Sequence, residues 1–437
     1  MKRKLIFLTL LPAFIFIQFL SAQDVEYARQ IIRDLSSPDM YGRGYIKKGD
    51  LKAAKYIGKE FKSIGLENYS KKYLQPFSVS VNTFPGIMQL RLNEQLLVPG
   101  KDYIISPESS SAKGKFDAYL IRYSDLAYGD NWLKILGESS GKFIIIDKTL
   151  PDVDILKKED EERINEIFGF MLMHPEYPAA GTILCIKDKL NWKGSMVEGS
   201  KPFFIVNTTL DPDEIKSVEI NIENVFYRSY QTNNLIGILP GKIYPDSFIV
   251  FTAHYDHLGQ MGSAATFPGA NDNASGVAML LNLAQFYAGE ENQPPYSMGF
   301  IALGAEELGI LGADYYVENP VFPLSNISFL INIDLAGNGE EGITVVNGSV
   351  YNSKFELLKK INDVYHFLPQ VKARNEACNS DHCAFHKKGV PCFFMYTMGG
   401  STAYHDIYDT AESLPLTSFE NYFKLLKSFA DSLQTNY

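Results

Sequence analysis

The sequence predicts a three-layer α/β protein whose mostly parallel central sheet is covered by helices on both faces, with a small β-rich domain inserted into it. Two observations lead to this prediction. From residue 233 onward, apolar runs of buried-strand type alternate with helical patterns, which is typical of parallel sheets. Between residues 86 and 228, short apolar runs are separated by turn residues, which is typical of a β-rich module.

Length and composition bound the class of protein. A chain of 437 residues is long enough for two or three domains with sizeable cores. Its apolar fraction of 46% and aromatic fraction of 13% are those of a folded globular protein. The formal net charge of -10 argues against nucleic acid as a partner, because nucleic-acid binding needs a basic footprint.

The first 22 residues have the pattern of a secretory signal peptide. Basic residues at 2–4 precede an apolar run at 5–20, and small residues follow it. A transmembrane anchor is the alternative, but the run is short for a span and Pro12 interrupts it. We therefore expect an exported protein, periplasmic or secreted, that has no membrane association after cleavage.

Residues 24–85 are expected to form the N-terminal part of the main domain. Apolar residues recur at helical spacing over 50–64, and Gly65 suits the C-terminal cap. The tract MYGRG before this helix is expected to be a loop, and residues 71–81 have strand character.

Residues 86–228 are expected to form the inserted β-rich domain. Strands are predicted at 141–148, 179–187 and 201–207, with a charged helix between them at 157–168. Cys185 and Cys392 lie in apolar runs and are expected in the core, whereas the spacing of Cys378 and Cys383 leaves a disulfide between them open.

Residues 229–437 are expected to form the catalytic domain. Strands are predicted at 234–241, 247–256, 296–307 and 327–338, and helices at 275–288, 308–319 and 418–433. In open parallel sheets chemistry gathers at the carboxyl ends of the strands, and four polar residues stand at such ends. They are His254, Glu306, Glu307 and Asp334.

Each of these residues also has an ordinary interpretation. His254, with Asp256 two positions on, could be a buried histidine satisfied by an acid; Glu306 and Glu307 could be a solvated helix start. Asp272 could cap the following helix, but its neighbours could do so equally and leave Asp272 free. His405 could be an unremarkable loop histidine. If every one of these ordinary interpretations were correct, the occurrence of all these residues in one domain would be a coincidence.

Taken together, the residues predict two metal sites that share Asp272. His254, Asp272 and Asp334 would form one, and Asp272, Glu307 and His405 the other. Nitrogen and carboxylate ligands without thiolate suit zinc, with cobalt or manganese as alternatives. Asp256 would orient His254 through its other ring nitrogen.

Six tracts resemble the co-catalytic dizinc aminopeptidase family, also called metallopeptidase family 28: FTAHYDHLG, GANDNASGVAMLL, GAEELGILGADYY, INIDLAGNG, SDHCAFHKKGVP and AYHDIYDT. The resemblance implies a dizinc exopeptidase fold with Glu306 as general base and Glu307 as ligand. It also implies that Tyr404 stabilises the oxyanion and that Asp256 contacts a metal ligand rather than the metal itself. Residues 86–228 resemble a protease-associated insert.

The resemblance implies a zinc aminopeptidase that acts on peptides through a metal-bridging water. A glutaminyl-peptide cyclase, a carboxypeptidase of the same fold and a non-catalytic binding protein are the alternatives. Recognition of a free carboxylate would favour arginine, and Arg374 is the only arginine within 229–437. We interpret Asp381 and His382 as loop structure and assign no role to His257. Oligomeric state cannot be read from the sequence.

Overall fold

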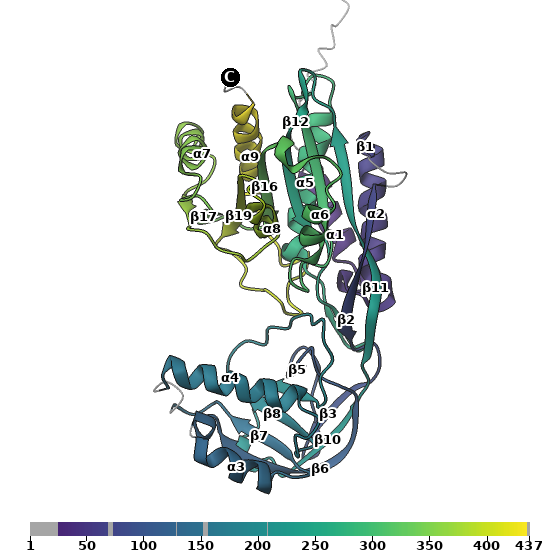
Figure 1. Cartoon of the computed structure of the whole chain (residues 1–437), viewed down its shortest axis with the longest axis vertical. Coiled ribbons are helices and arrows are strands. Elements are labelled where there is room, and N and C mark those ends of the chain that lie inside the picture. Colours follow the sequence, from purple (N-terminus) through teal and green to yellow (C-terminus); the bar gives the residue numbers. More distant parts are fainter. Residues whose placement is uncertain (1–24, 69–72, 128, 152–155, 208, 435–437) are drawn as a thin grey trace, which may run out of the picture.

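The computed structural model describes residues 25–68, 73–127, 129–151, 156–207 and 209–434. The signal peptide expected at 1–22 lies outside these residues. The described chain forms two lobes, each built on its own sheet (Figure 1).

The larger lobe contains a nine-stranded mixed sheet. Its four central strands are parallel, as predicted, and the strands toward both edges are antiparallel apart from the last pair, β17 and β18. In spatial order these strands are β1 (Glu67–Asn68), β11 (Val225–Leu239), β15 (Tyr296–Leu303), β12 (Tyr244–His254), β16 (Ile327–Asp334), β19 (Cys392–Met398), β17 (Gly342–Val346) and β18 (Val371–Ala373), and β2 (Leu74–Thr83) pairs with β11.

Helices cover both faces of this sheet, which confirms the predicted fold class (Figure 1). One face packs against α1 (Val25–Leu35), α2 (Gly49–Ile64), α5 (Gly276–Ala288), α7 (Asn352–Tyr365) and α9 (Phe419–Leu433). The other face packs against α6 (Leu311–Glu318) and α8 (His382–Lys387). Helices α2 and α9 agree with the sequence prediction within one residue at each end.

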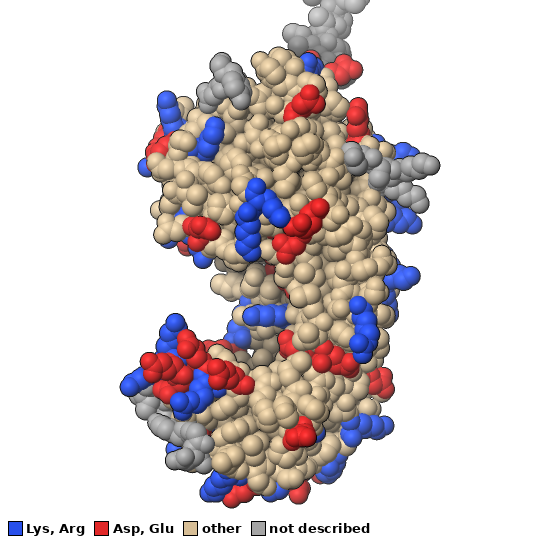
Figure 2. Space-filling view, in the orientation of Figure 1, with Lys and Arg blue, Asp and Glu red and all other residues tan. Residues whose placement is uncertain are grey.

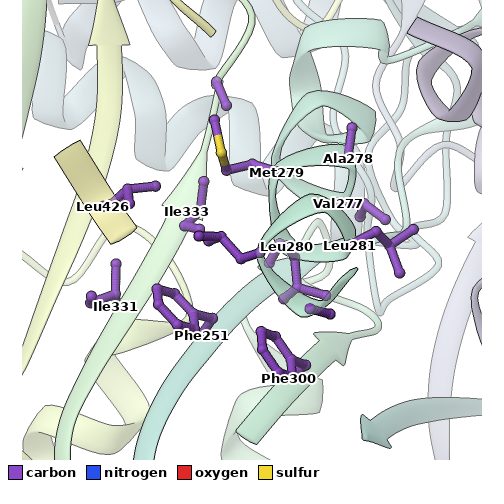
Figure 3. Packing of buried hydrophobic residues seen from close by; sticks show 14 of the residues in the cluster. Phe251, Val277, Ala278, Met279, Leu280, Leu281, Phe300, Ile331, Ile333 and Leu426 are labelled. Atoms are coloured by element: carbon purple, nitrogen blue, oxygen red, sulfur yellow. The ribbon is translucent and has the colours of Figure 1, made fainter. Parts of the chain in front are cut away.

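Successive side chains of β12 point to opposite faces of the sheet, and both faces are buried. Ile249 and Phe251 belong to the core on the α5 face, whereas Phe248 and Val250 belong to the core on the α6 face. Figure 3 shows Phe251 among side chains from α5, β15, β16 and α9. Each large apolar side chain buried in this way contributes about 1.5–3 kcal/mol, so the strands that carry the candidate site have a rigid support.

The second lobe is built mainly from residues 88–222 and has an eight-stranded sheet. It also holds two helices, α3 (Gly129–Glu138) and α4 (Lys158–Met173), so it is a mixed α/β unit and more helical than the expected β-rich module. Its strands in spatial order are β4 (Gln95–Leu96), β3 (Met88–Leu92), β10 (Ser217–Ile222), β6 (Ala112–Arg122), β7 (Phe143–Asp147), β8 (Gly181–Cys185), β9 (Phe203–Val206) and β5 (Tyr103–Ile105).

The two lobes share structure at their junction. Strand β11 runs across the expected boundary at residue 228. The hairpin of β13 (Gly259–Met261) and β14 (Ala265–Phe267) follows β12 in the chain but packs into the core of the second lobe. On one side of the molecule a hollow separates the lobes (Figure 2).

Short helical turns lie at η1 (Pro38–Arg43), η2 (Ile46–Lys48), η3 (Tyr123–Ala127), η5 (Pro212–Glu214), η6 (Ala270–Ser275) and η7 (Leu324–Asn326). Cys378 and Cys383 form a disulfide, and Cys185 and Cys392 are buried and free, as expected of core residues. Within the described ranges, no helix combines the length and apolarity needed to cross a membrane.

Candidate metal centre

Asp272 lies between two histidines that come from distant parts of the chain. Its Oδ1 is 3.3 Å from Nε2 of His254, and its Oδ2 is 3.1 Å from Nε2 of His405. Asp334 Oδ2 approaches the same His254 nitrogen at 3.3 Å, and Glu307 Oε2 approaches the same His405 nitrogen at 3.2 Å. The structure thus brings all five predicted ligands together, in the two sets that the sequence suggested.

The spacing of these atoms fits metal coordination. Ligands about 2.0–2.1 Å from a tetrahedral zinc ion lie about 3.3 Å from one another. The four nitrogen–oxygen distances, from 3.1 to 3.3 Å, match that spacing. His254, Asp272 and Asp334 are buried, and buried carboxylates crowded in this way need positive charge close by.

The electrostatics of the cluster also favour a bound cation. Burial opposes a charged His254, but the carboxylates of Asp334 and Glu306 outweigh it and hold the His254 pKa well above its ordinary value. The pKa of His405 rises to about 11 for the same reason, with Glu307 the strongest carboxylate. The site therefore attracts a cation at both histidines, whether a proton or a metal ion.

Asp256 supports the site differently from the sequence expectation. Its carboxylate accepts hydrogen bonds from the backbone N–H groups of Glu306, at 3.0 Å, and Glu307, at 3.3 Å. The Nδ1 atom of His254 lies 3.2 Å from the backbone oxygen of Asp256 but 3.9 Å from its carboxylate. Asp256 thus holds the turn that carries the two glutamates, and its backbone carbonyl orients His254.

The loop that carries Asp272 is held from two sides by residues that the sequence analysis did not single out. Asp409 accepts hydrogen bonds from the backbone N–H groups of Asn271, at 2.8 Å, and Asp272, at 3.0 Å. Arg43 is fully buried and donates to the carbonyls of Gly269, at 2.6 Å, and Asp272, at 3.1 Å.

Arg43 also donates to three other carbonyls, from Leu35, Tyr255 and Pro268. Burial lowers the pKa of its guanidinium to about 10. The tract MYGRG, expected to be a loop, therefore supplies the buried cation that joins the N-terminal segment to the Asp272 loop.

Asn273, the neighbour of Asp272, contacts the start of the next helix through its side chain. Its Oδ1 accepts a hydrogen bond from the backbone N–H of Gly276, at 2.9 Å, at the start of α5. Its Nδ2 donates to the carbonyl of Ile333 at 3.0 Å. Because the neighbour satisfies the helix start, the carboxylate of Asp272 stays free to face the two histidines.

Glu306 and Tyr404 border the ligand cluster. Burial raises the pKa of Glu306 well above its ordinary value; the positive charge of His254 opposes this shift, and the negative charges of Asp381 and Glu307 add to it. The ring of Tyr404 stacks on that of His405 with centroids 4.0 Å apart, and the residue is 45% exposed. Tyr404 can therefore meet a ligand that enters from solvent.

Two further residues enter the site. Nδ1 of His257, which had no assigned role, lies 2.7 Å from Oε1 of Glu307. The interpretation of Asp381 and His382 as loop structure is wrong for His382, which begins α8. Asp381 is fully buried, burial raises its pKa to about 8, and neither carboxylate oxygen has a hydrogen-bond partner among the described residues.

The second lobe also reaches the site. The Nδ1 atom of His405 lies 3.0 Å from the backbone oxygen of Trp192. This contact favours the tautomer that carries its proton on Nδ1 and leaves Nε2 free for a metal. Nothing in the sequence around Trp192 signalled it, because any residue can supply a backbone carbonyl.

Comparison with known proteins finds similarity to peptidases. The family described as Peptidase family M28 matches residues 234–430. Aminopeptidase YwaD of Bacillus subtilis is 31% identical over 176 residues, which are 38% of this chain and 35% of that protein. Leupeptin-inactivating enzyme 1 of Streptomyces exfoliatus is 31% identical over 162 residues, 36% of this chain and 34% of that protein. The match thus spans about a third of the length of each of these two relatives.

Solved structures extend the likeness to both lobes. BSAP, a zinc aminopeptidase from Bacillus subtilis, aligns with a TM-score of 0.67 at 18% identity, over 95% of this chain and 96% of that one. A peptidase M28 precursor from Shewanella amazonensis aligns with a TM-score of 0.69 at 17% identity, over 95% and 94%. At these identities the likeness concerns the fold. Residues 234–430 thus match peptidase family M28, and both lobes share their fold with these two structures.

Proposed function

We propose that this protein is an exported zinc aminopeptidase that removes the N-terminal residue of peptides. The observation that carries the proposal is the position of Asp272, whose two oxygens face Nε2 of His254 and Nε2 of His405 separately. A carboxylate placed in this way can bridge two cations, so we propose two zinc ions per chain, with cobalt or manganese as alternatives. The relatives named as aminopeptidases support the reaction type.

The proposed ligands are His254, Asp272 and Asp334 for one ion, and Asp272, Glu307 and His405 for the other. When bound, such ions supply Lewis-acid polarisation of a carbonyl and lower the pKa of water. Glu306 would accept a proton from the attacking water at a carboxylate oxygen and pass it to the leaving amine. Its raised pKa suits a group that must hold that proton between the two transfers.

Tyr404 would donate a hydrogen bond from its phenol to the carbonyl oxygen as negative charge develops there. Burial raises its pKa above the ordinary value, and the carboxylates of the site add to this shift. The phenol therefore keeps its proton at neutral pH and remains a donor.

The arginines favour recognition of an amine over a carboxylate. Arg43 is fully buried and its donors are occupied by backbone carbonyls. The exposed Arg374 donates a hydrogen bond to the hydroxyl of Tyr396, at 3.4 Å. The guanidinium of Arg43 is therefore not available to pair with a substrate carboxylate, whereas the carboxylates of the site can receive an ammonium group.

Export to the periplasm or outside the cell is part of the proposal. It rests on the signal-peptide pattern at residues 1–22. The disulfide between Cys378 and Cys383 supports it, because disulfides persist in oxidising compartments.

The proposal is tested with zinc-equilibrated protein and a substrate panel. We expect about two zinc ions per chain by metal analysis, and hydrolysis of peptides with a free N-terminus but not of N-acetylated copies. Hydrolysis of N-blocked peptides from the C-terminus would indicate a carboxypeptidase. A clean stoichiometry of one zinc, with cyclisation of an N-terminal glutamine, would indicate the cyclase.

A further inference from the structure

The loop that carries Tyr404 and His405 has little regular structure of its own. It follows β19, which ends at Met398, and the next helix begins at Phe419. Within the loop, the carboxylate of Asp406 accepts hydrogen bonds from the backbone N–H groups of Tyr408, at 2.8 Å, and Tyr404, at 3.4 Å. These local bonds shape the loop but do not attach it to a sheet.

A lysine of the second lobe attaches residues 402–406 of this loop to that lobe. The ammonium group of Lys189 contacts Oδ2 of Asp406 at 2.7 Å and donates to the carbonyls of Thr402, at 2.7 Å, and Tyr404, at 3.0 Å. An ammonium group has three donors, and these three contacts account for all of them. The three acceptors lie on both sides of His405 in the chain.

The backbone of Trp192 holds the same loop at its centre. The Trp192 N–H donates to the carbonyl of His405 at 2.9 Å, while its own carbonyl faces Nδ1 of the His405 ring at 3.0 Å. Trp192 is in turn anchored in the core of the second lobe. Its indole N–H donates to the carbonyl of Ile105 at 2.8 Å, and its ring stacks on Phe267 with centroids 4.7 Å apart.

We propose that the inserted lobe positions part of the catalytic centre. Lys189 is the positioning residue through which this lobe holds residues 402–406. His405 and Tyr404 would then keep their places only while the two lobes stay in contact. The consequence for zinc and turnover rests on the proposed function, whereas the attachment of the loop does not.

The loop has room to move if Lys189 releases it. A cavity of about 540 Å³ lies between the lobes beside this contact, lined among others by Lys101, Lys189, Thr402, Asp406 and Tyr408. Without the ammonium group, Asp406 would have no cationic partner there and the carbonyls of Thr402 and Tyr404 would turn to solvent. The loop would then sample positions in which His405 no longer faces Asp272 and Glu307.

The test compares the substitutions Lys189→Met and Lys187→Met. Methionine keeps the apolar stem of lysine and removes its charge. Lys187 is a matched control, because it lies two residues earlier and its ammonium donates to the carbonyl of Thr149, within the second lobe. Backbone hydrogen exchange of residues 402–408 is measured in metal-free protein, and zinc affinity and steady-state kinetics are measured after loading.

We expect Lys189→Met to speed exchange at 402–408 by about tenfold or more, because the loop opens locally while both sheets stay intact. Zinc affinity should fall by about tenfold, the low end for groups that orient a ligand, and kcat should fall more than KM rises. Lys187→Met should behave as the unchanged protein. Lys189→Arg, which keeps the charge facing Asp406, should recover a large part of the protection.

Equal exchange at 402–408 in all variants would overturn the proposal. So would a loss of protection spread evenly through the second lobe, because Lys189 would then only stabilise that lobe. If the loaded protein hydrolyses no peptide, the proposed function fails, but hydrogen exchange in the metal-free protein still decides whether Lys189 holds the loop.

Discussion

The Nδ1 atom of His257 lies 2.7 Å from Oε1 of Glu307, whereas Nε2 of His405 lies 3.2 Å from the other oxygen, Oε2. Glu307 therefore has one oxygen held by His257 and one facing Nε2 of His405. The Nε2 atom of His257 has no hydrogen-bond partner among the described residues, so the Nδ1–H donor to Glu307 is its main polar contact. His257 thus orients Glu307, a proposed metal ligand.

The first prediction concerns this contact. His257→Leu should lower zinc affinity by about 10- to 100-fold, the usual effect of removing a group that orients a ligand. His257→Asn should retain most of the affinity, because its amide N–H can stand near the position of Nδ1. Competition with a chromophoric chelator measures both. Equal affinities of the leucine variant and the unchanged protein would refute this role.

The second prediction separates the two adjacent glutamates. Glu306→Gln should keep both zinc ions but lower kcat by at least about a hundredfold, because amides cannot accept the proton of the attacking water. Glu307→Gln should instead lower the zinc content. Metal analysis and kinetics of the same preparations distinguish the two. Near-normal turnover of Glu306→Gln would show that the roles are assigned wrongly.

The third prediction concerns the hydroxyl of Tyr404. Tyr404→Phe keeps the ring that stacks on His405 and removes only the donor. We expect kcat to fall by about tenfold to a thousandfold, a range that includes typical oxyanion donors, with little change in KM. Steady-state kinetics on one aminoacyl substrate provide the measurement. An unchanged kcat with a raised KM would mean that the hydroxyl binds the substrate in its ground state.

The fourth prediction concerns stability and pH. Asp50 is fully buried and accepts hydrogen bonds from the hydroxyls of Tyr230, at 2.6 Å, and Thr232, at 2.9 Å. Burial raises its pKa from 3.8 to about 7, although both hydrogen bonds oppose the shift. Between these two values the folded state holds a proton that the unfolded state has released.

The contribution of Asp50 to the free energy of unfolding therefore falls as pH rises from about 4 to about 7, by at most about 1.4 kcal/mol per pH unit, and is constant above that window. Asp50→Asn removes the titration. We expect the Tm of this variant, relative to the unchanged protein, to rise between pH of about 5 and about 7. Parallel Tm profiles of the two metal-free proteins would contradict the raised pKa.

The fold of the larger lobe and the candidate ligands could be predicted because their signals are local. A buried parallel strand needs a continuous apolar run, as in β12 and β16, and its last residue emerges at the edge where neighbouring strands also end. His254 and Asp334 stand at such ends in adjacent parallel strands. Once the strands are placed, these side chains must be near one another.

The second lobe was less predictable. Its charged helix α4 had a clear pattern, but α3 was not expected, and the hairpin β13–β14 packs with residues far earlier in the chain. Hairpin residues such as Phe267 carry no mark of the sheet that they will join. The partner is chosen by long-range packing, which short sequence patterns do not encode.

The sequence by itself determined the layered α/β fold of the larger lobe and the identity of the five residues of the candidate metal centre, because strand and helix periodicity and residue type are properties of short segments. Only the tertiary structure decided what holds those residues in place. Arg43 and Lys189 act on backbone carbonyls, and Trp192 acts through its own backbone. Because every residue has a carbonyl, such contacts leave no signature in the sequence and arise only when distant segments pack together.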